Sequence, residues 1–266
     1  MKIAIIGTGN IGGAIARGLV NGTIINPSDV TCTAHPEYDS LDKLREIHPD
    51  IHVTYDNQEA VSQSDIIIIS VKPWRVESVI DEIKPVLDFD RHMILSVAAG
   101  ITFDLLNSYL TKNMDSKISP TIFRIMPNTA IAVMSSMTFV SARNASKEQT
   151  TQVLNIFKEM GDAMLIEERL MSAGTALASS GIAFAMRYIR ASIEGGVELG
   201  FYPQEAQEIV LQTVKGAVDL LQHNRSNPEA EIDKVTTPGG ITIKGLNEME
   251  LSGFTSSVIR GLKASK

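Results

Sequence analysis

Hydrophobic residues follow two different patterns along the chain, and the pattern changes near residue 168. The first part alternates short, continuous apolar runs with segments whose apolar positions recur every three or four residues. Runs such as IIIISV suit strands that are covered on both faces, as in a parallel sheet. We therefore expect strands at residues 3–6, 30–34, 66–71, 93–97, 122–126 and 163–166.

Helical segments lie between these expected strands. Ile11, Ile15 and Leu19 share one helical face, and the stretch 76–83 has the same spacing. Alternating strands and helices imply an α/β domain with an open, doubly wound, Rossmann-type sheet.

The remaining residues contain no convincing strand and predict an all-α region. Segments 170–200 and 203–223 have the pattern of long helices, residues 223–231 that of a polar loop, and a third helix is expected after 236–240. We place the domain boundary so that residues 1–167 form the sheet domain and 168–266 the helical domain. The first long helix is rich in Ala, Ser and Gly, so we hypothesise that it packs against a second subunit.

Composition narrows the functional classes. The chain has 266 residues, 44% hydrophobic and 21% charged, with a formal net charge of -7. That acidic balance argues against nucleic acid and against an anionic membrane surface, both of which attract basic faces. No apolar run approaches the roughly 20 residues of a membrane span. With one cysteine, Cys32, no internal disulfide can form, and a cytoplasmic location is expected.

The segment GTGNIG at residues 7–12 has the G-x-G-x-x-G pattern, directly after one expected strand and at the start of a helix. Gly7 permits the tight turn, Gly9 lets the backbone approach a pyrophosphate, and Gly12 allows the helix to pack on the strand. The first N–H groups of the helix then face the phosphates. The context predicts dinucleotide binding in the N-terminal half.

The end of the second expected strand bears on the choice of cofactor. An Asp or Glu there would bind the ribose 2′-hydroxyl of NAD, but Ala34 and His35 occupy this place. His35 could donate to a 2′-phosphate, and an ordinary loop histidine is an equal alternative. NADP(H) is therefore favoured, with NAD(H) as the alternative.

Four further segments form one constellation with the glycine loop. They are VKPW (71–74), SVAAGI (96–101), RIMPNT (124–129) and DKVTTPGGITIKGL (233–246). Together they resemble the 1-pyrroline-5-carboxylate reductase family, in order and spacing along essentially the whole chain. The resemblance implies a Rossmann domain followed by a helical dimerisation domain. It also implies NADPH- or NADH-dependent reduction of 1-pyrroline-5-carboxylate to L-proline, and a homo-oligomer, either an intertwined dimer or a larger ring such as a decamer.

The resemblance also implies roles for individual residues. His35 would contact the adenosine 2′-phosphate and Asn57 the adenosine ribose. The other implied cofactor contacts are Gly7, Gly9, Asn10, Ile11 and Gly12 at the pyrophosphate, Val71, Lys72, Pro73, Ala98, Ala99 and Gly100 along the cofactor, and Met126, Pro127 and Asn128 near the nicotinamide.

The segment TTPGGIT matches the family's substrate loop. Thr237, Gly239, Gly240 and Thr242 would bind the substrate, with the backbone and Thr237 at the carboxylate and Thr242 at the ring nitrogen. The residues alone agree, because a Pro-Gly-Gly turn exposes N–H groups that can converge on an anion. The same turn could also start a helix without binding a ligand. We find no motif for a nucleophile or a metal site, so catalysis is assigned to positioning, with Thr242 as the catalytic residue.

One segment departs from the family pattern. In SAGTALASSGIAF (172–184), Ser172 replaces an acid, Ser179 a glycine, Ile182 a proline and Phe184 a tyrosine. Two alternatives follow: a related reductase of another small imine or keto acid, and a paralog that binds dinucleotide without turnover.

Overall fold

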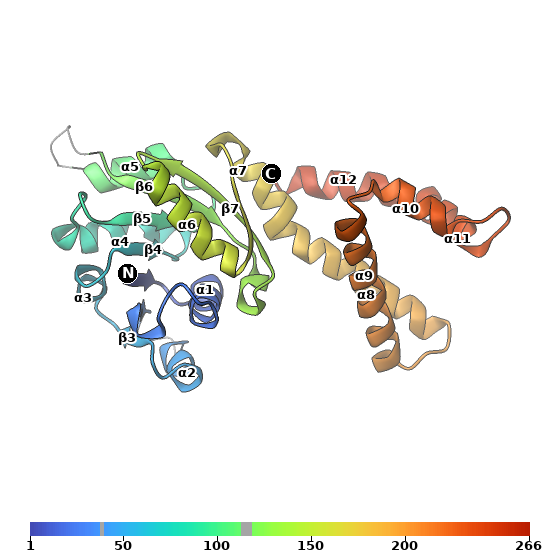
Figure 1. The fold of residues 1–266 in the computed structure, drawn as a ribbon, viewed down its shortest axis with the longest axis horizontal. Coiled ribbons are helices and arrows are strands. Elements are labelled where there is room, and N and C mark those ends of the chain that lie inside the picture. Colours follow the sequence, from blue (N-terminus) through green and yellow to red (C-terminus); the bar gives the residue numbers. More distant parts are fainter. Residues whose placement is uncertain (38–39, 113–118) are drawn as a thin grey trace. The chain divides into compact units, whose positions relative to one another are not determined.

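The computed structural model describes residues 1–37, 40–112 and 119–266. The chain divides into two compact units, Met1–Ser179 and Ser180–Lys266 (Figure 1). The first is built on a sheet covered by helices, and the second consists of helices.

The described part of the first unit holds one sheet of eight strands in the order β3-β2-β1-β4-β5-β6-β7-β8 (Figure 1). β7 runs antiparallel to β6, and every other neighbouring pair is parallel. The predicted doubly wound sheet is confirmed. The strands are β1 Ile3–Ile6, β2 Val30–Thr33, β3 His52–Thr54, β4 Ile66–Ile69, β5 Met93–Ser96, β6 Thr121–Met126, β7 Ser136–Arg143 and β8 Gly161–Leu165.

Two of these strands were not expected from the sequence. β3 has three residues, none of them fully buried, so it lacks an apolar run. β7 mixes Ser, Thr and Arg with apolar residues, and its buried side chains include Thr138 and Ser141. Backbone pairing with β6 and β8 on either side makes it a strand despite this composition.

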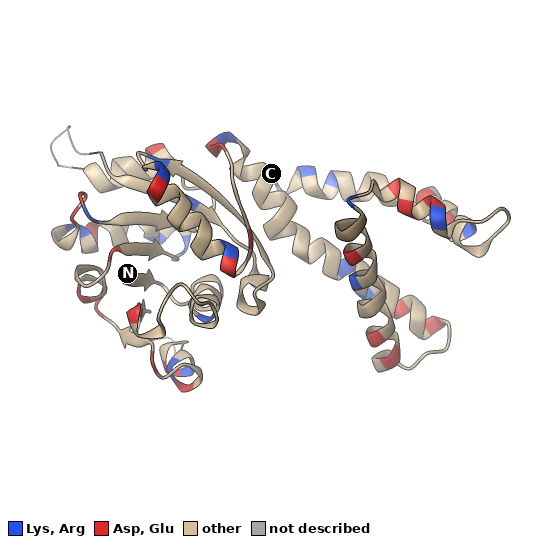
Figure 2. Cartoon of the chain, viewed as in Figure 1, with Lys and Arg blue, Asp and Glu red and all other residues tan. Residues whose placement is uncertain are grey.

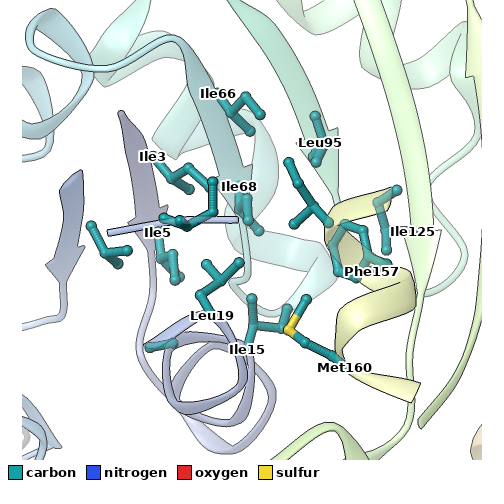
Figure 3. Close-up of a cluster of buried hydrophobic side chains, with 14 of the residues drawn as sticks. Ile3, Ile5, Ile15, Leu19, Ile66, Ile68, Leu95, Ile125, Phe157 and Met160 are labelled. Atoms are coloured by element: carbon teal, nitrogen blue, oxygen red, sulfur yellow. The ribbon is translucent and has the colours of Figure 1, made fainter. Parts of the chain in front are cut away.

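Helices cover both faces of the sheet. On one face, Ile3 and Ile5 of β1 share a core with α1, α2 and α6, and Phe157 and Met160 close that core (Figure 3). On the other face, Ala4 and Ile6 pack with α3, α4 and α5. The alternation follows from the pleat, which sends successive side chains to opposite faces. The helices are α1 Asn10–Asn21, α2 Ser40–Ile47, α3 Asn57–Ser62, α4 Val76–Ile83, α5 Phe103–Thr111 and α6 Lys147–Glu159.

The predicted helix over 170–200 is wrong as a single element. A 3₁₀ turn, η5 (Glu168–Leu170), leads into α7 (Met171–Gly174), and then a π-helical turn, η6 (Thr175–Ser180), precedes α8 (Gly181–Glu198). The chain packs closely against β7 just before this π-helical turn, since a Cβ on Gly174 would lie 2.7 Å from the Phe139 ring. A period of 3.6 residues in the apolar pattern cannot reveal a wider turn of this kind.

The second unit contains α8, α9 (Pro203–Asn224), α10 (Pro228–Val235), α11 (Ile241–Leu251) and α12 (Phe254–Ala264). Part of the expected polar loop 223–231 is helical, because the Asn227 side chain accepts from Glu229 N–H and Pro228 starts α10. The helices α8 to α11 carry both acidic and basic residues, whereas the charged residues of α12, Arg260 and Lys263, are both basic (Figure 2). The α12 helix was not expected.

Candidate functional site

The glycine loop lies where strand order reverses, because β1 pairs with β2 on one side and β4 on the other. Ligands of doubly wound sheets bind at the carboxyl ends of strands at this switch point. Gly7 has φ +94°, and a Cβ on Gly12 would lie 2.1 Å from the Gly7 carbonyl oxygen. Both positions therefore require glycine for the turn itself.

Gly9 has a different reason to be glycine. A Cβ at this position would meet no protein atom within 4 Å, so packing within the chain does not exclude a side chain. Gly9 is the N-cap of α1, its cap makes no side-chain hydrogen bond, and no acid lies in the first turn. The uncapped N–H groups and the helix dipole together favour an anion. The loop thus fits a dinucleotide pyrophosphate, with Asn10 and Ile11 in the first turn of the helix.

The other predicted cofactor residues in the centre of the sheet follow the carboxyl ends of β4, β5 and β6. Val71 and Lys72 lead into a 3₁₀ turn that begins at Pro73, and Gly100 adopts φ +77° two residues after buried Ala98. Met126 ends β6. Because these strands are parallel neighbours, the segments share one edge of the sheet with the glycine loop.

Asn128 is almost fully buried, and its hydrogen bonds stay within the protein. Its side-chain oxygen accepts from Ala130 N–H at 3.0 Å, and its side-chain nitrogen donates to the Ala178 carbonyl oxygen at 3.4 Å. Ala178 belongs to the π-helical turn η6. Asn128 therefore ties the loop after β6 to the segment that departs from the family pattern. Its predicted place beside the nicotinamide stays a prediction.

A hydrogen-bonded chain runs outward from the glycine loop at the end of β2. The Thr33 carbonyl oxygen accepts from Gly7 N–H at 3.0 Å and from Thr8 N–H at 2.9 Å. The Thr33 hydroxyl donates to Asn57 Oδ1 at 2.6 Å, and Asn57 Nδ2 donates to both carboxylate oxygens of Glu82 at 3.0 and 3.1 Å. Sequence reasoning missed Thr33 and Glu82, because no motif spacing links them to Asn57.

His35 is exposed, two residues beyond β2. Its Nδ1 lies 3.5 Å from a carboxylate oxygen of Glu37. The sequence leaves no acid at positions 34 and 35, yet the fold brings Glu37 beside His35 and Glu82 against Asn57.

The predicted substrate loop lies in the second unit. Gly240 N–H donates to the Thr237 carbonyl oxygen at 2.9 Å, and Gly239 has φ +71°, so Pro238 and Gly239 turn the chain tightly. A Cβ on Gly240 would lie 2.5 Å from the Thr237 hydroxyl oxygen. Gly240 is the N-cap of α11, where no side chain caps the helix, and Thr242 is exposed in the first turn.

Cys32 lies on β2, and its side chain is buried in the core. Burial raises the pKa of its thiol to about 12, because the thiolate would be desolvated. Its interpretation as a core residue rather than a reactive thiol agrees with this environment.

Comparison with known proteins agrees with this geometry. Residues 2–100 match a family model described as NADP oxidoreductase, coenzyme F420-dependent, and residues 168–266 match one described as pyrroline-5-carboxylate reductase dimerisation. Pyrroline-5-carboxylate reductase 2 of Dictyostelium discoideum is 37% identical over 99% of this chain and 90% of its own length. The chain belongs to the pyrroline-5-carboxylate reductase family.

Two further relatives extend the comparison. Pyrroline-5-carboxylate reductase 1 of Dictyostelium discoideum is also 37% identical over 99% of this chain, which spans only 48% of that longer protein. A crystal structure of pyrroline carboxylate reductase from Plasmodium falciparum with NADP bound has a TM-score of 0.88 and 26% identity, and covers 100% of this chain and 95% of that one. The family resemblance drawn from the five motifs is therefore confirmed. In the described part of this family member, no helix has the length and apolarity needed to cross a membrane.

Proposed function

We propose that the protein reduces 1-pyrroline-5-carboxylate to L-proline with NADPH. The observation that carries the proposal is the family match along 99% of the chain, which extends through both units. The uncapped helix start behind Gly9 supports it independently, since this is the feature that a dinucleotide pyrophosphate requires.

The residues named from the sequence would contact different parts of the cofactor. The N–H groups from Gly9 to Gly12 would hold the pyrophosphate, and His35 and Asn57 the adenosine ribose and its phosphate. The segments 71–73 and 98–100 would border the groove, and 126–128 would lie at the nicotinamide. NADPH is favoured because His35 stands where many NAD enzymes carry an acid.

The chemistry requires positioning more than acid–base groups. The nicotinamide supplies a hydride to the carbon of the imine C=N bond. Thr237 and the backbone of Gly239 and Gly240 would hold the substrate carboxylate at the start of α11, where the dipole favours an anion. The Thr242 hydroxyl would hydrogen-bond the ring nitrogen, and the proton on that nitrogen comes from the substrate's protonated form or from water.

Assembly and location belong to the same proposal. The helical unit would pair with that of a second copy as an intertwined dimer, which could build a larger ring such as a decamer. The single buried cysteine suits a reducing, cytoplasmic setting.

The test follows NADPH absorbance as 1-pyrroline-5-carboxylate is added to purified protein, with NADH in a parallel series. We expect substrate-dependent oxidation with higher kcat/KM for NADPH. Thr242→Ala should lower kcat about tenfold and leave NADPH binding unchanged, while Thr242→Ser should retain most of the activity. Saturable NADPH binding without oxidation would contradict the proposal and favour a dinucleotide-binding paralog. Oxidation only with other imines or keto acids would assign another substrate.

A further inference from the structure

The contact between Glu82 and Asn57 decides which way round the Asn57 amide points. An amide has a donor end and an acceptor end, and it can present either to a ligand. The Thr33 hydroxyl cannot choose between them, because a hydroxyl both donates and accepts. It could satisfy Oδ1 as a donor or Nδ2 as an acceptor.

The Glu82 carboxylate does distinguish the two ends. An ionised carboxylate only accepts hydrogen bonds, so Nδ2 must face it, and Nδ2 lies 3.0 and 3.1 Å from its two oxygens. The reversed amide would set Oδ1 against the carboxylate, acceptor against acceptor. Thr33 then meets Oδ1 at 2.6 Å. The orientation of Asn57 therefore depends on Glu82.

The fold brings Glu82 to this place from a different element. Glu82 lies near the end of α4, and its backbone carbonyl oxygen accepts from the Gln58 side chain at 2.7 Å, which holds α4 against the start of α3. That contact uses the backbone, so a change of the Glu82 side chain leaves it intact. Thr33 continues the chain to Gly7 and Thr8, so the oriented amide is connected to the glycine loop.

We infer that Glu82 is a positioning residue for the dinucleotide: its carboxylate locks the Asn57 amide so that Oδ1 offers its remaining acceptor site to a ribose hydroxyl. The inference rests on the proposed function, because it takes the glycine loop and the neighbouring strand ends to bind NAD(P)H.

The test uses Glu82→Gln, which keeps the side-chain shape but can both donate and accept. Dissociation constants of NADPH and NADH are measured by cofactor fluorescence, and KM and kcat by absorbance. We expect Glu82→Gln to weaken both dinucleotides about fivefold, as the loss of one oriented hydrogen bond implies, with kcat changed less than about twofold.

A double-mutant cycle separates the mechanisms. If Glu82 acts through Asn57, Glu82→Gln has no further effect in an Asn57→Ala background, where there is no amide to orient. The control is Asp81→Asn, which removes the same charge one residue away and should bind both dinucleotides as the wild type does. Asp81 pairs with Lys84, not with Asn57.

Three results would overturn the inference. Unchanged dinucleotide binding by Glu82→Gln would remove the role of Glu82 and leave the proposed function standing. Tighter NADPH binding, persisting in the Asn57→Ala background, would show that the carboxylate acts directly by repelling the 2′-phosphate. Failure of the wild-type protein to bind either dinucleotide would overturn the proposed function and this inference with it.

Discussion

The two units of this chain bury their side chains to very different extents. In the first unit, two clusters of apolar residues fill both faces of the sheet, and Ile3, Ile5, Ile66 and Ile68 are at most 1% exposed. In residues 180–266, all of which the structure describes, Ala206 alone is buried. A sheet with helices on both faces completes its core within one chain. Extended helices that leave their apolar faces exposed require another surface, which agrees with the match to a dimerisation family model.

The first unit should lose both stability and dinucleotide binding when the geometry of its glycine turn is disturbed. Gly12→Ala places a Cβ against the Gly7 carbonyl oxygen, a backbone atom that cannot move away. We expect a loss of at least about 3 kcal/mol of unfolding free energy and no saturable dinucleotide binding. Denaturant titration and cofactor fluorescence measure the two effects. The control is Gly13→Ala, whose Cβ would meet no atom closer than 3.5 Å; equal damage by both would contradict the packing argument.

In the second unit, substitutions on the exposed apolar face should weaken the dimer. Leu211, Val214 and Val218 follow one face of α9, and Leu211 is 46% exposed in the single chain. If this face pairs with a second copy, Leu211→Asp should weaken the dimer by roughly 2 to 3 kcal/mol, because it buries an unpaired charge in place of a leucine. Light scattering over a dilution series measures it. Gln212→Asp, on another face of the helix, should leave the dimer intact, and an unaltered dimer in Leu211→Asp would place the interface elsewhere.

A partly buried ion pair between β6 and the turn η5 should contribute more to stability than an exposed pair beside it. Arg124 on β6 is 8% exposed and pairs with Glu168, which also accepts from Phe103 N–H. Glu168→Ala leaves the guanidinium buried without a partner, and should cost about 2 kcal/mol of unfolding free energy. Glu167→Ala breaks only the exposed pair with Arg169 and should cost less than about 0.5 kcal/mol. Denaturant titration of both variants measures the two losses of unfolding free energy, which can then be compared.

The smallest effect is expected at the turn between α9 and α10. Hydrogen bonds from Lys234, Ser226 and Asn224 lower the pKa of Glu231 to about 2. Because the folded pKa lies below the ordinary value of 4.5, the stabilisation is present above that value and is lost as the pH falls towards 2. NMR titration of the Glu231 carboxyl and of neighbouring amides should show this midpoint, and Glu231→Gln should remove it. A midpoint near 4.5 would contradict these contacts.

The sequence predicted the sheet where apolar runs are continuous, and failed where tertiary pairing decides the structure. β4 is four buried isoleucines and could be read directly, whereas β7 depends on its two neighbouring strands. The π-helical turn η6 and the helix α10 were missed because wide turns and short capped helices leave weak periodicity.

The candidate site divides in the same way. Gly7, Gly9 and Gly12 could be identified from the sequence, because the backbone requirements they meet are local and form a recognisable motif. Glu82 could not be identified in this way. It lies far from Asn57 in the sequence, and the two residues meet only because α4 packs beside α3. A pattern along the chain finds turns, while contacts between elements require the fold.

The proposed function depends most directly on hydride transfer from the nicotinamide to the imine carbon. Purified protein would be incubated with 1-pyrroline-5-carboxylate and NADPH deuterated at C4 of the nicotinamide, separately in each of the two stereochemical positions, and the product analysed by mass spectrometry. We predict L-proline carrying one deuterium at the former imine carbon from one of the two cofactors and none from the other. Proline without deuterium from either, or no proline while NADPH is still bound, would contradict the proposed hydride transfer.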